Sequence, residues 1–92
     1  MRISGITRHA AERFQQRSVP AQIFHLLEEY GDAERSHGCD LLFFSKAAKA
    51  RIARDWGNEF RHIERWMKVY AVVADSGAVV TVGHRTKRIS RH

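Results

Sequence analysis

The chain has 92 residues, of which 43% are hydrophobic, and 16 Lys and Arg residues oppose 10 Asp and Glu residues. This length suits one domain with one compact core, and the composition argues against disorder in most of the chain. The longest apolar run, residues 69–74, is far shorter than a membrane span requires, and a single cysteine excludes an internal disulfide. We therefore expect one domain over residues 1–92, with a cytoplasmic location and no membrane partner.

The net charge of +6 is unevenly distributed along the chain. Residues 18–34 carry four acidic side chains and no Lys or Arg, whereas residues 76–92 carry four basic side chains and no acid. A domain with such a charge separation can steer a polyanion toward its basic end. Arg accounts for most of the excess, and its guanidinium matches the geometry of phosphate. The pattern predicts an anion-binding end with a basic tail over residues 86–92.

Two helices are expected near the N-terminus. Thr7 is a suitable cap for a first helix over residues 8–16, on which His9, Arg13 and Arg17 share one stripe. A break before Pro20 separates it from a second helix over residues 20–30. Its apolar stripe is predicted to be buried, and Gly31 is a suitable stop; the stripe consists of Ile23, Leu26, Leu27 and Tyr30.

Residues 32–36 and 40–44 are predicted to form two short strands around a turn at His37 and Gly38. Ser45 is a suitable cap for a long middle helix. Apolar residues recur at helical spacing through Gly57 and Asn58, so either one helix tolerates the glycine or two helices are kinked there. The apolar positions are Ala48, Ile52, Trp56, Phe60, Ile63 and Met67.

Residues 68–75 and 78–84 are predicted to form a hairpin. The first of these strands is apolar without alternation, which predicts a central strand covered on both faces. Along the second strand, alternation places His84 on one face with Val80 and Val82, and Arg85 on the other with Val79 and Thr81, unless Gly83 marks a bulge. The predicted fold is α+β: two N-terminal helices and a long middle helix packed on a four-stranded, largely antiparallel sheet.

No metal or nucleotide motif is present. The six His residues show no HExxH spacing, and there is no CxxC, GxSxG, GxGxxG or P-loop pattern. We therefore expect no cofactor and no metal. Cleavage of RNA without a metal needs a proton acceptor, a proton donor and cations that stabilise the phosphorane, which are roles that His and Arg can fill. His84 and Arg85 supply such a pair at the end of a strand, and His9 and Arg13 supply another, with Thr81 as a hydroxyl donor.

Two stretches resemble a small bacterial domain family of unknown function. Residues 9–20 (HAAERFQQRSVP) resemble its opening, and residues 70–73 (YAVV) with 78–88 (AVVTVGHRTKR) resemble its closing hairpin. That family is similar to the RelE-type toxins and to the wider group of barnase, EndoU and the colicin tRNases, in which metal-independent ribonuclease activity is common. The resemblance implies a RelE/barnase-like fold with charged residues on the exposed face of the sheet.

By this resemblance, the protein is expected to be a metal-independent ribonuclease-like domain of RelE-toxin type that acts on or binds RNA. The predicted catalytic residues are Thr81, His84, Arg85, His9 and Arg13. Additional phosphate contacts are assigned to Arg17, Lys87, Arg88 and Arg91. Two alternatives stay open: a nucleic-acid-binding module without catalysis, and a regulatory module that binds an acidic antitoxin-like protein.

Overall fold

The computed structural model describes residues 5–16 and 19–85, and for residues 13–16 it describes the backbone alone. Within these ranges the chain forms five strands and three α-helices, and two short 3₁₀ helices, η1 and η2, lie between α3 and β4. The order is β1 (Gly5–Ile6), α1 (Arg8–Gln16), α2 (Ala21–Tyr30), β2 (Asp32–Ser36), β3 (Cys39–Phe43), α3 (Lys46–Trp56), η1 (Gly57–His62), η2 (Glu64–Trp66), β4 (Val69–Ala74) and β5 (Ala78–His84).

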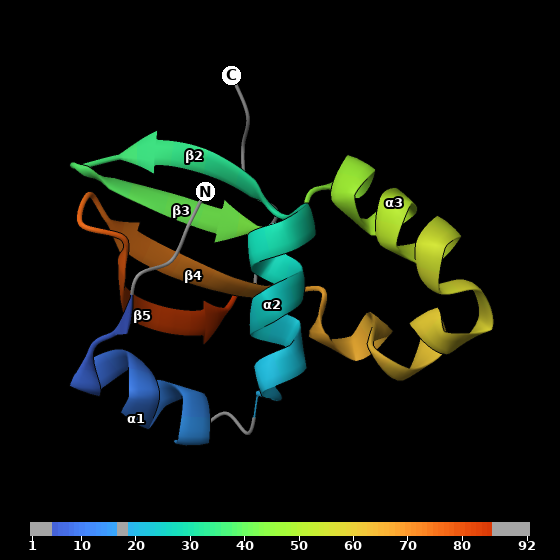
Figure 1. Cartoon of the computed structure of the whole chain (residues 1–92), viewed down its shortest axis with the longest axis horizontal. Helices are drawn as coiled ribbons and strands as arrows, with labels where there is room; N and C mark the ends of the chain where they lie inside the picture. Colours follow the sequence, from blue (N-terminus) through green and yellow to red (C-terminus); the bar gives the residue numbers. More distant parts are fainter. Residues whose placement is uncertain (1–4, 17–18, 86–92) are drawn as a thin grey trace.

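The strands form one five-stranded mixed sheet in the order β1-β5-β4-β3-β2 (Figure 1). β1 runs parallel to β5, and the other neighbours are antiparallel. The predicted four-stranded, largely antiparallel sheet is therefore wrong. The additional strand, β1, is only two residues long, so it has no alternation from which a sequence could predict it.

The prediction of a long middle helix is also wrong. α3 ends at Trp56, because Gly57 has φ 58° and ψ −131°, a conformation that L-residues with a side chain rarely adopt. The chain continues in the tighter turns of η1 and η2, which keep Phe60, Ile63 and Met67 directed toward the core. Apolar residues at the spacing of a single α-helix are thus distributed over one α-helix and two 3₁₀ helices.

Several predicted helix and turn signals are confirmed. Thr7 Oγ1 accepts the backbone N–H of Ala10 at 3.2 Å, and Ser45 Oγ accepts that of Ala48 at 3.0 Å. His37 and Gly38 both have positive φ, as a two-residue hairpin turn requires. Caps and turns depend on a few adjacent residues, so the sequence alone was sufficient to predict them.

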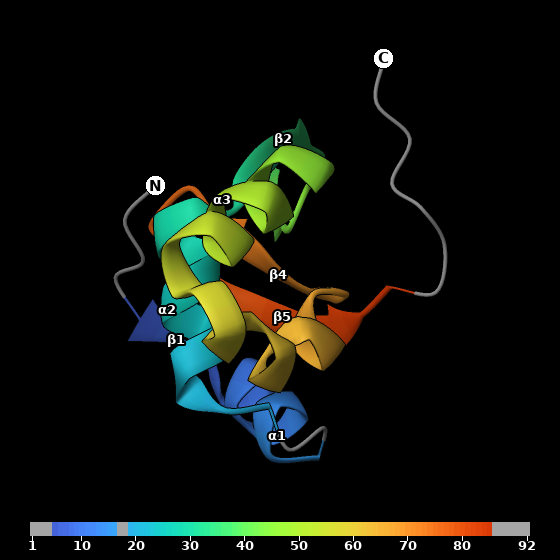
Figure 2. The ribbon, with the colours of Figure 1, turned by 90° about the vertical axis from the view of Figure 1, so that its right-hand side faces the viewer.

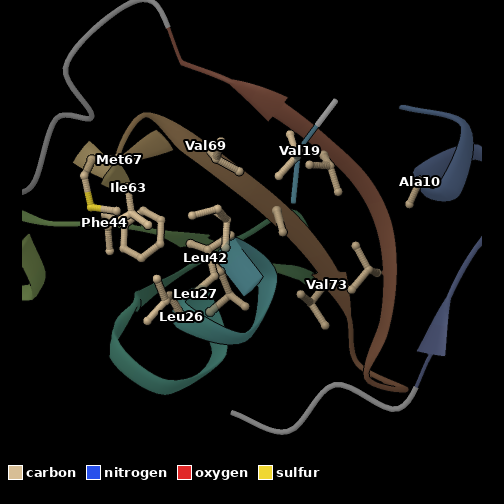
Figure 3. Packing of buried hydrophobic residues seen from close by; sticks show 14 of the residues in the cluster. Ala10, Val19, Leu26, Leu27, Leu42, Phe44, Ile63, Met67, Val69 and Val73 are labelled. Atoms are coloured by element: carbon tan, nitrogen blue, oxygen red, sulfur yellow. The ribbon is translucent and has the colours of Figure 1, made fainter. Parts of the chain in front are cut away.

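One face of the sheet carries the hydrophobic core (Figure 3). β4 is the central strand of the sheet, as predicted, but only Val69, Ala71 and Val73 are buried and the alternate residues are half-buried, so the expected burial of both faces is found on one face. α1 packs along β5, and α2 lies across the face at β3 (Figure 1). We call this the helix face; its sheet residues include Leu42, Val69, Ala71, Val73, Val79 and Val82.

α3, η1 and η2 lie beside the end of the sheet, where β3 and β5 end and β4 begins (Figures 1 and 2). We call this segment, Lys46 to Lys68, the arm. Its inner residues, including Ile52 and Ile63, join the same hydrophobic core as α2 and the sheet. Within the described part of the chain, no helix is both long and apolar enough to span a bilayer.

Candidate nucleic-acid interface

An irregularity in the β4–β5 hairpin decides which side chains of β5 share a face. Val72 pairs with Thr81 but Val73 pairs with Val79, so Val80 is an extra residue in β5. Residues that pair directly across antiparallel strands place their side chains on the same face. Val82 and His84, opposite Ala71 and Val69, therefore belong to the helix face, whereas Thr81 and Gly83 belong to the other face.

We call this other face the second face. It includes Leu41, Tyr70, Val72 and Thr81, all of them half-buried, from the three central strands of the sheet. Unlike the helix face, it does not contribute these side chains to the hydrophobic cluster that packs against α1 and α2. It therefore presents aromatic, aliphatic and hydroxyl groups at a partly accessible surface.

Tyr70 lies directly over Gly83 on the second face. A Cβ atom at position 83 would lie 2.8 Å from Tyr70 Oη and 3.0 Å from its Cζ, closer than such atoms approach in proteins. Gly83 is buried as a result, and its lack of a side chain is what lets the phenol cross β5. The pair places an aromatic ring against the backbone of β5, and Tyr70 as a whole is half-buried.

Arg85 follows β5 and turns onto the second face, to which Phe43 belongs because it pairs with Tyr70. Its guanidinium carbon lies 5.9 Å from the centre of the Phe43 ring, and its Nη2 donates to Phe44 O at 3.0 Å. Its backbone N–H donates to Lys68 O at 2.8 Å. Because Phe44 lies just before the arm and Lys68 is its last residue, Arg85 holds together the two ends of that segment. Its Nε atom is buried and has no hydrogen-bond partner among the described residues.

His84 points to the opposite side of the sheet from Arg85. It pairs with Val69, a residue of the helix face, and its ring centre lies 6.0 Å from that of Trp66. Arg65 stacks on the same tryptophan, with its guanidinium carbon 5.0 Å from the ring centre. The predicted pair of His84 and Arg85 is thus divided between two environments, although the residues are neighbours in sequence.

His9 lies near the other end of β5 from His84. His9 is exposed in the first turn of α1, and that helix follows Thr7, whose backbone N–H donates to Val79 O at 2.9 Å. Val79 and His84 are five residues apart, which is about 16 Å along an extended strand. Arg13 lies in α1, where only its backbone is described. The predicted phosphate ligands Arg17, Lys87, Arg88 and Arg91 lie outside the described residues.

Charge is segregated between the two ends of the sheet. Around β2, Arg35 bridges the carboxylates of Asp40 and Asp75, at 3.5 and 2.5 Å. The hydrogen bond from Arg35 holds the pKa of Asp75 below its ordinary value. The arm, at the other end, carries most of the described Lys and Arg residues. A polyanion would approach the arm and the end of β5 rather than β2.

A metal site is not formed by the described residues, among which no three His, Cys, Asp or Glu side chains gather. Trp66 and Phe43, which lie beside the predicted residues, belong to no motif in the sequence. Tyr70 lies in the YAVV stretch that carries the family resemblance, but nothing there assigned it a role in the site. If the pairing continued without a bulge from Val73 and Val79, Tyr70 would pair with Val82. The register expected from the sequence would therefore not have placed Tyr70 over Gly83.

Comparisons with protein-family models, with curated proteins and with solved structures gave no match. The resemblance to the RelE-type group therefore stays a prediction from the residues that carry it.

Proposed function

We propose that this protein binds single-stranded RNA across the second face of its sheet, without cleaving it. The observation that carries the proposal is Tyr70, a half-buried residue whose ring is held over Gly83. Bases stack on aromatic side chains in single-stranded nucleic-acid sites, and each such contact contributes about 1–3 kcal/mol. Thr81, two residues before Gly83 on the same face, offers a hydroxyl for a base edge or a 2′-hydroxyl.

Charge supports a polyanion as the ligand. The chain has a net charge of +6, and the cationic arm adjoins the end of β5 where the second face ends. Phosphate contacts by Lys and Arg provide most of the non-specific affinity of nucleic-acid-binding proteins. The resemblance to a group that acts on RNA favours RNA over DNA.

Binding fits the geometry better than cleavage. Metal-independent cleavage needs proton-transfer groups and cations gathered at one phosphate. Here His84 and Arg85 face opposite sides of the sheet, and His9 lies near the other end of β5. Arg85 is also engaged with the carbonyl of Phe44, which gives it a structural task.

The test is fluorescence anisotropy with a labelled single-stranded RNA in EDTA, read alongside a gel of the same RNA. We expect salt-dependent binding and intact RNA. Tyr70→Ser should weaken binding about tenfold or more, whereas Tyr70→Phe, which keeps the ring, should bind like the wild type. Arg8→Ala is the control, because Arg8 is an exposed cation on α1, away from the second face.

Four results would overturn the proposal. Equal binding by the wild type and Tyr70→Ser would remove Tyr70 from the interface. A log K that does not change with log salt would exclude phosphate contacts. Cleavage of the RNA in EDTA would restore the ribonuclease hypothesis, and a DNA strand of the same sequence that binds more tightly than RNA would change the ligand class.

A further inference from the structure

The arm is the most strongly cationic surface that the structure describes. Between Lys46 and Lys68 the sequence has seven Lys and Arg residues and three carboxylates. All seven cationic side chains are exposed except that of Lys49, which is half-buried. They are Lys46, Lys49, Arg51, Arg54, Arg61, Arg65 and Lys68.

Little of this charge is neutralised within the arm. Among the described residues, its ion pairs are Arg54 with Asp55 at 3.2 Å and His62 with Glu59 at 3.8 Å. Asp55 is shared, because it also accepts a hydrogen bond from Tyr30 Oη at 2.8 Å. The cationic ends of Lys46 and Lys68 are paired with no carboxylate of the described residues. The surface therefore attracts an anion.

The exposed side of α3 has a particular composition. Ala48 and Ile52 are buried, which fixes the side of the helix that faces the core. With about 100° per residue, the opposite side carries two cations and two alanines, and a third cation, Arg51, lies at its edge beside α2. The four residues of the opposite side, all exposed, are Lys46, Ala47, Ala50 and Arg54. Since methyl groups do not project far, a ligand can approach the helix closely while the cations reach to either side of it.

A duplex suits this surface better than a single strand. Single strands depend on aromatic side chains for stacking, and the exposed side of α3 has only Ala, Lys and Arg. Double-stranded RNA is recognised by its shape, through phosphates and 2′-hydroxyls across a wide, shallow minor groove. Lys46 and Arg54 are separated by about 12 Å along the helix axis, which lets them reach different phosphates.

The arm also has a fixed position relative to the second face. Arg85 joins the two, since its Nη2 donates to Phe44 O before α3 and its backbone N–H donates to Lys68 O after η2. In addition, Arg51 Nη2 donates to Tyr30 O at 3.0 Å, which attaches α3 to the end of α2. A ligand that touches both surfaces therefore meets them at one defined separation.

We infer that the exposed side of α3 binds the sugar-phosphate backbone of double-stranded RNA. Resting on the proposed function, this inference makes the ligand an RNA in which a stem adjoins a single-stranded segment. The stem would lie on α3 and the single strand on the second face.

The experiment compares three labelled RNAs: a stem-loop with a single-stranded tail, the blunt stem-loop and the tail alone. The variant Ala47→Glu/Ala50→Glu introduces two carboxylates between the cations, at exposed positions where Glu is a good helix former. The matched control is Ala11→Glu/Ala21→Glu, which makes the same change at exposed sites in α1 and α2. Circular dichroism and urea unfolding report that both variants are folded.

We expect the tailed stem-loop to bind more tightly than either part. The α3 variant should weaken binding of the tailed and the blunt stem-loop about tenfold or more, and lower the salt slope by about 1 for each phosphate that the variant no longer binds. Binding of the tail alone should be unchanged in it, and the control should bind all three RNAs like the wild type. Tyr70→Ser should show the reverse selectivity, with weaker binding of the tail and unchanged binding of the blunt stem-loop.

Each surface can fail separately. Wild-type affinity of the α3 variant for both stem-loops would overturn the duplex inference and leave the proposed function intact. An equal decrease in affinity for the tail and the blunt stem-loop would also overturn it, because the effect would then be one of general charge. If the blunt stem-loop binds but the tail does not, the proposed function fails and the duplex site stands.

Discussion

Arg85 donates a hydrogen bond from Nη2 to the backbone carbonyl of Phe44, 41 positions earlier in the chain, at 3.0 Å. Its backbone N–H also donates to Lys68 O. The residue therefore connects the end of β5 to the position where β3 ends and to the position before β4 begins. The sequence predicted that Arg85 is a catalytic cation. In the structure, Arg85 also makes hydrogen bonds that connect these parts of the fold.

Replacing Arg85 is expected to destabilise the fold. Arg85→Ala leaves the part-buried carbonyl of Phe44 without its donor, which costs about 1–3 kcal/mol in the free energy of unfolding. Arg65→Ala is the control, because Arg65 is an exposed cation that stacks on Trp66, and its removal should cost about 1 kcal/mol or less. Urea unfolding measures both. Unchanged stability of Arg85→Ala would show that the hydrogen bond to Phe44 O contributes nothing.

Tyr70 and Gly83 are expected to depend on each other. Gly83→Ala places a methyl group where Tyr70 Oη and Cζ lie, so the ring has to move, at a cost of about 1–3 kcal/mol. In a Tyr70→Ala background the same methyl group meets no ring, and most of that cost should disappear. A double-mutant cycle by urea unfolding measures this coupling. Additive effects of the two substitutions would mean that the ring does not lie over Gly83 in solution.

The hairpin shows why the site was only partly predictable from the sequence. Alternation along β5 correctly separated His84 from Arg85 and grouped Arg85 with Thr81. It wrongly grouped Val79 with Thr81, because Val79 pairs with Val73 of the helix face. The irregularity at Val80 was not predictable, because no glycine or other local signal marks that residue. Without it, Tyr70 would align with Val82, and its position over Gly83 would be missed. A one-residue shift in pairing reverses the face of every side chain beyond it.

In the fold as well, features that depend on neighbouring residues were predicted from the sequence, and features that depend on distant residues were not. Ser45 and Thr7 cap their helices as predicted, since a cap depends on residues three positions apart. β1 forms only because Gly5 and Ile6 meet β5 at Ala78 and Val79, more than 70 residues later. No local pattern reports such a contact. Similarly, the apolar spacing of the arm predicted which of its side chains face the core. It did not predict that η1 and η2 form there in place of a continued helix.

Gly57 is expected to be required for the end of α3. Its φ of 58° with ψ of −131° is accessible to glycine and costs a residue with a side chain about 1–3 kcal/mol. Gly57→Ala should therefore lower the free energy of unfolding by that amount. Gly5→Ala is the matched control, because a methyl group at Gly5 would meet no atom within 4 Å and its φ is not positive. Its stability should stay within about 1 kcal/mol of the wild type. A stable Gly57→Ala protein with more helix by circular dichroism would instead mean that α3 extends through η1.

Tyr30 is expected to control the titration of Asp55. Tyr30 Oη donates to Asp55 Oδ2 at 2.8 Å, and this hydrogen bond, ahead of the one from Arg54, holds the pKa of Asp55 below its ordinary value of 3.8. A carboxyl with a lowered pKa in the folded state stabilises the fold at pH values above its ordinary pKa. That contribution is lost as the pH falls through the lowered pKa. Tyr30→Phe should therefore raise the pKa of Asp55 and make the stability of the protein less sensitive to pH in this acidic range.

NMR titration of the side-chain carboxyl carbons, together with urea unfolding between about pH 2 and pH 5, measures both effects of Tyr30→Phe. Asp75 provides an internal control, because its pKa is lowered by Arg35 at the opposite end of the sheet and should be the same in both proteins. A pKa of Asp55 that is unchanged in Tyr30→Phe would assign its lowering to Arg54 instead. Parallel shifts of Asp55 and Asp75 would point to a change of the whole fold rather than to the removal of one hydrogen bond.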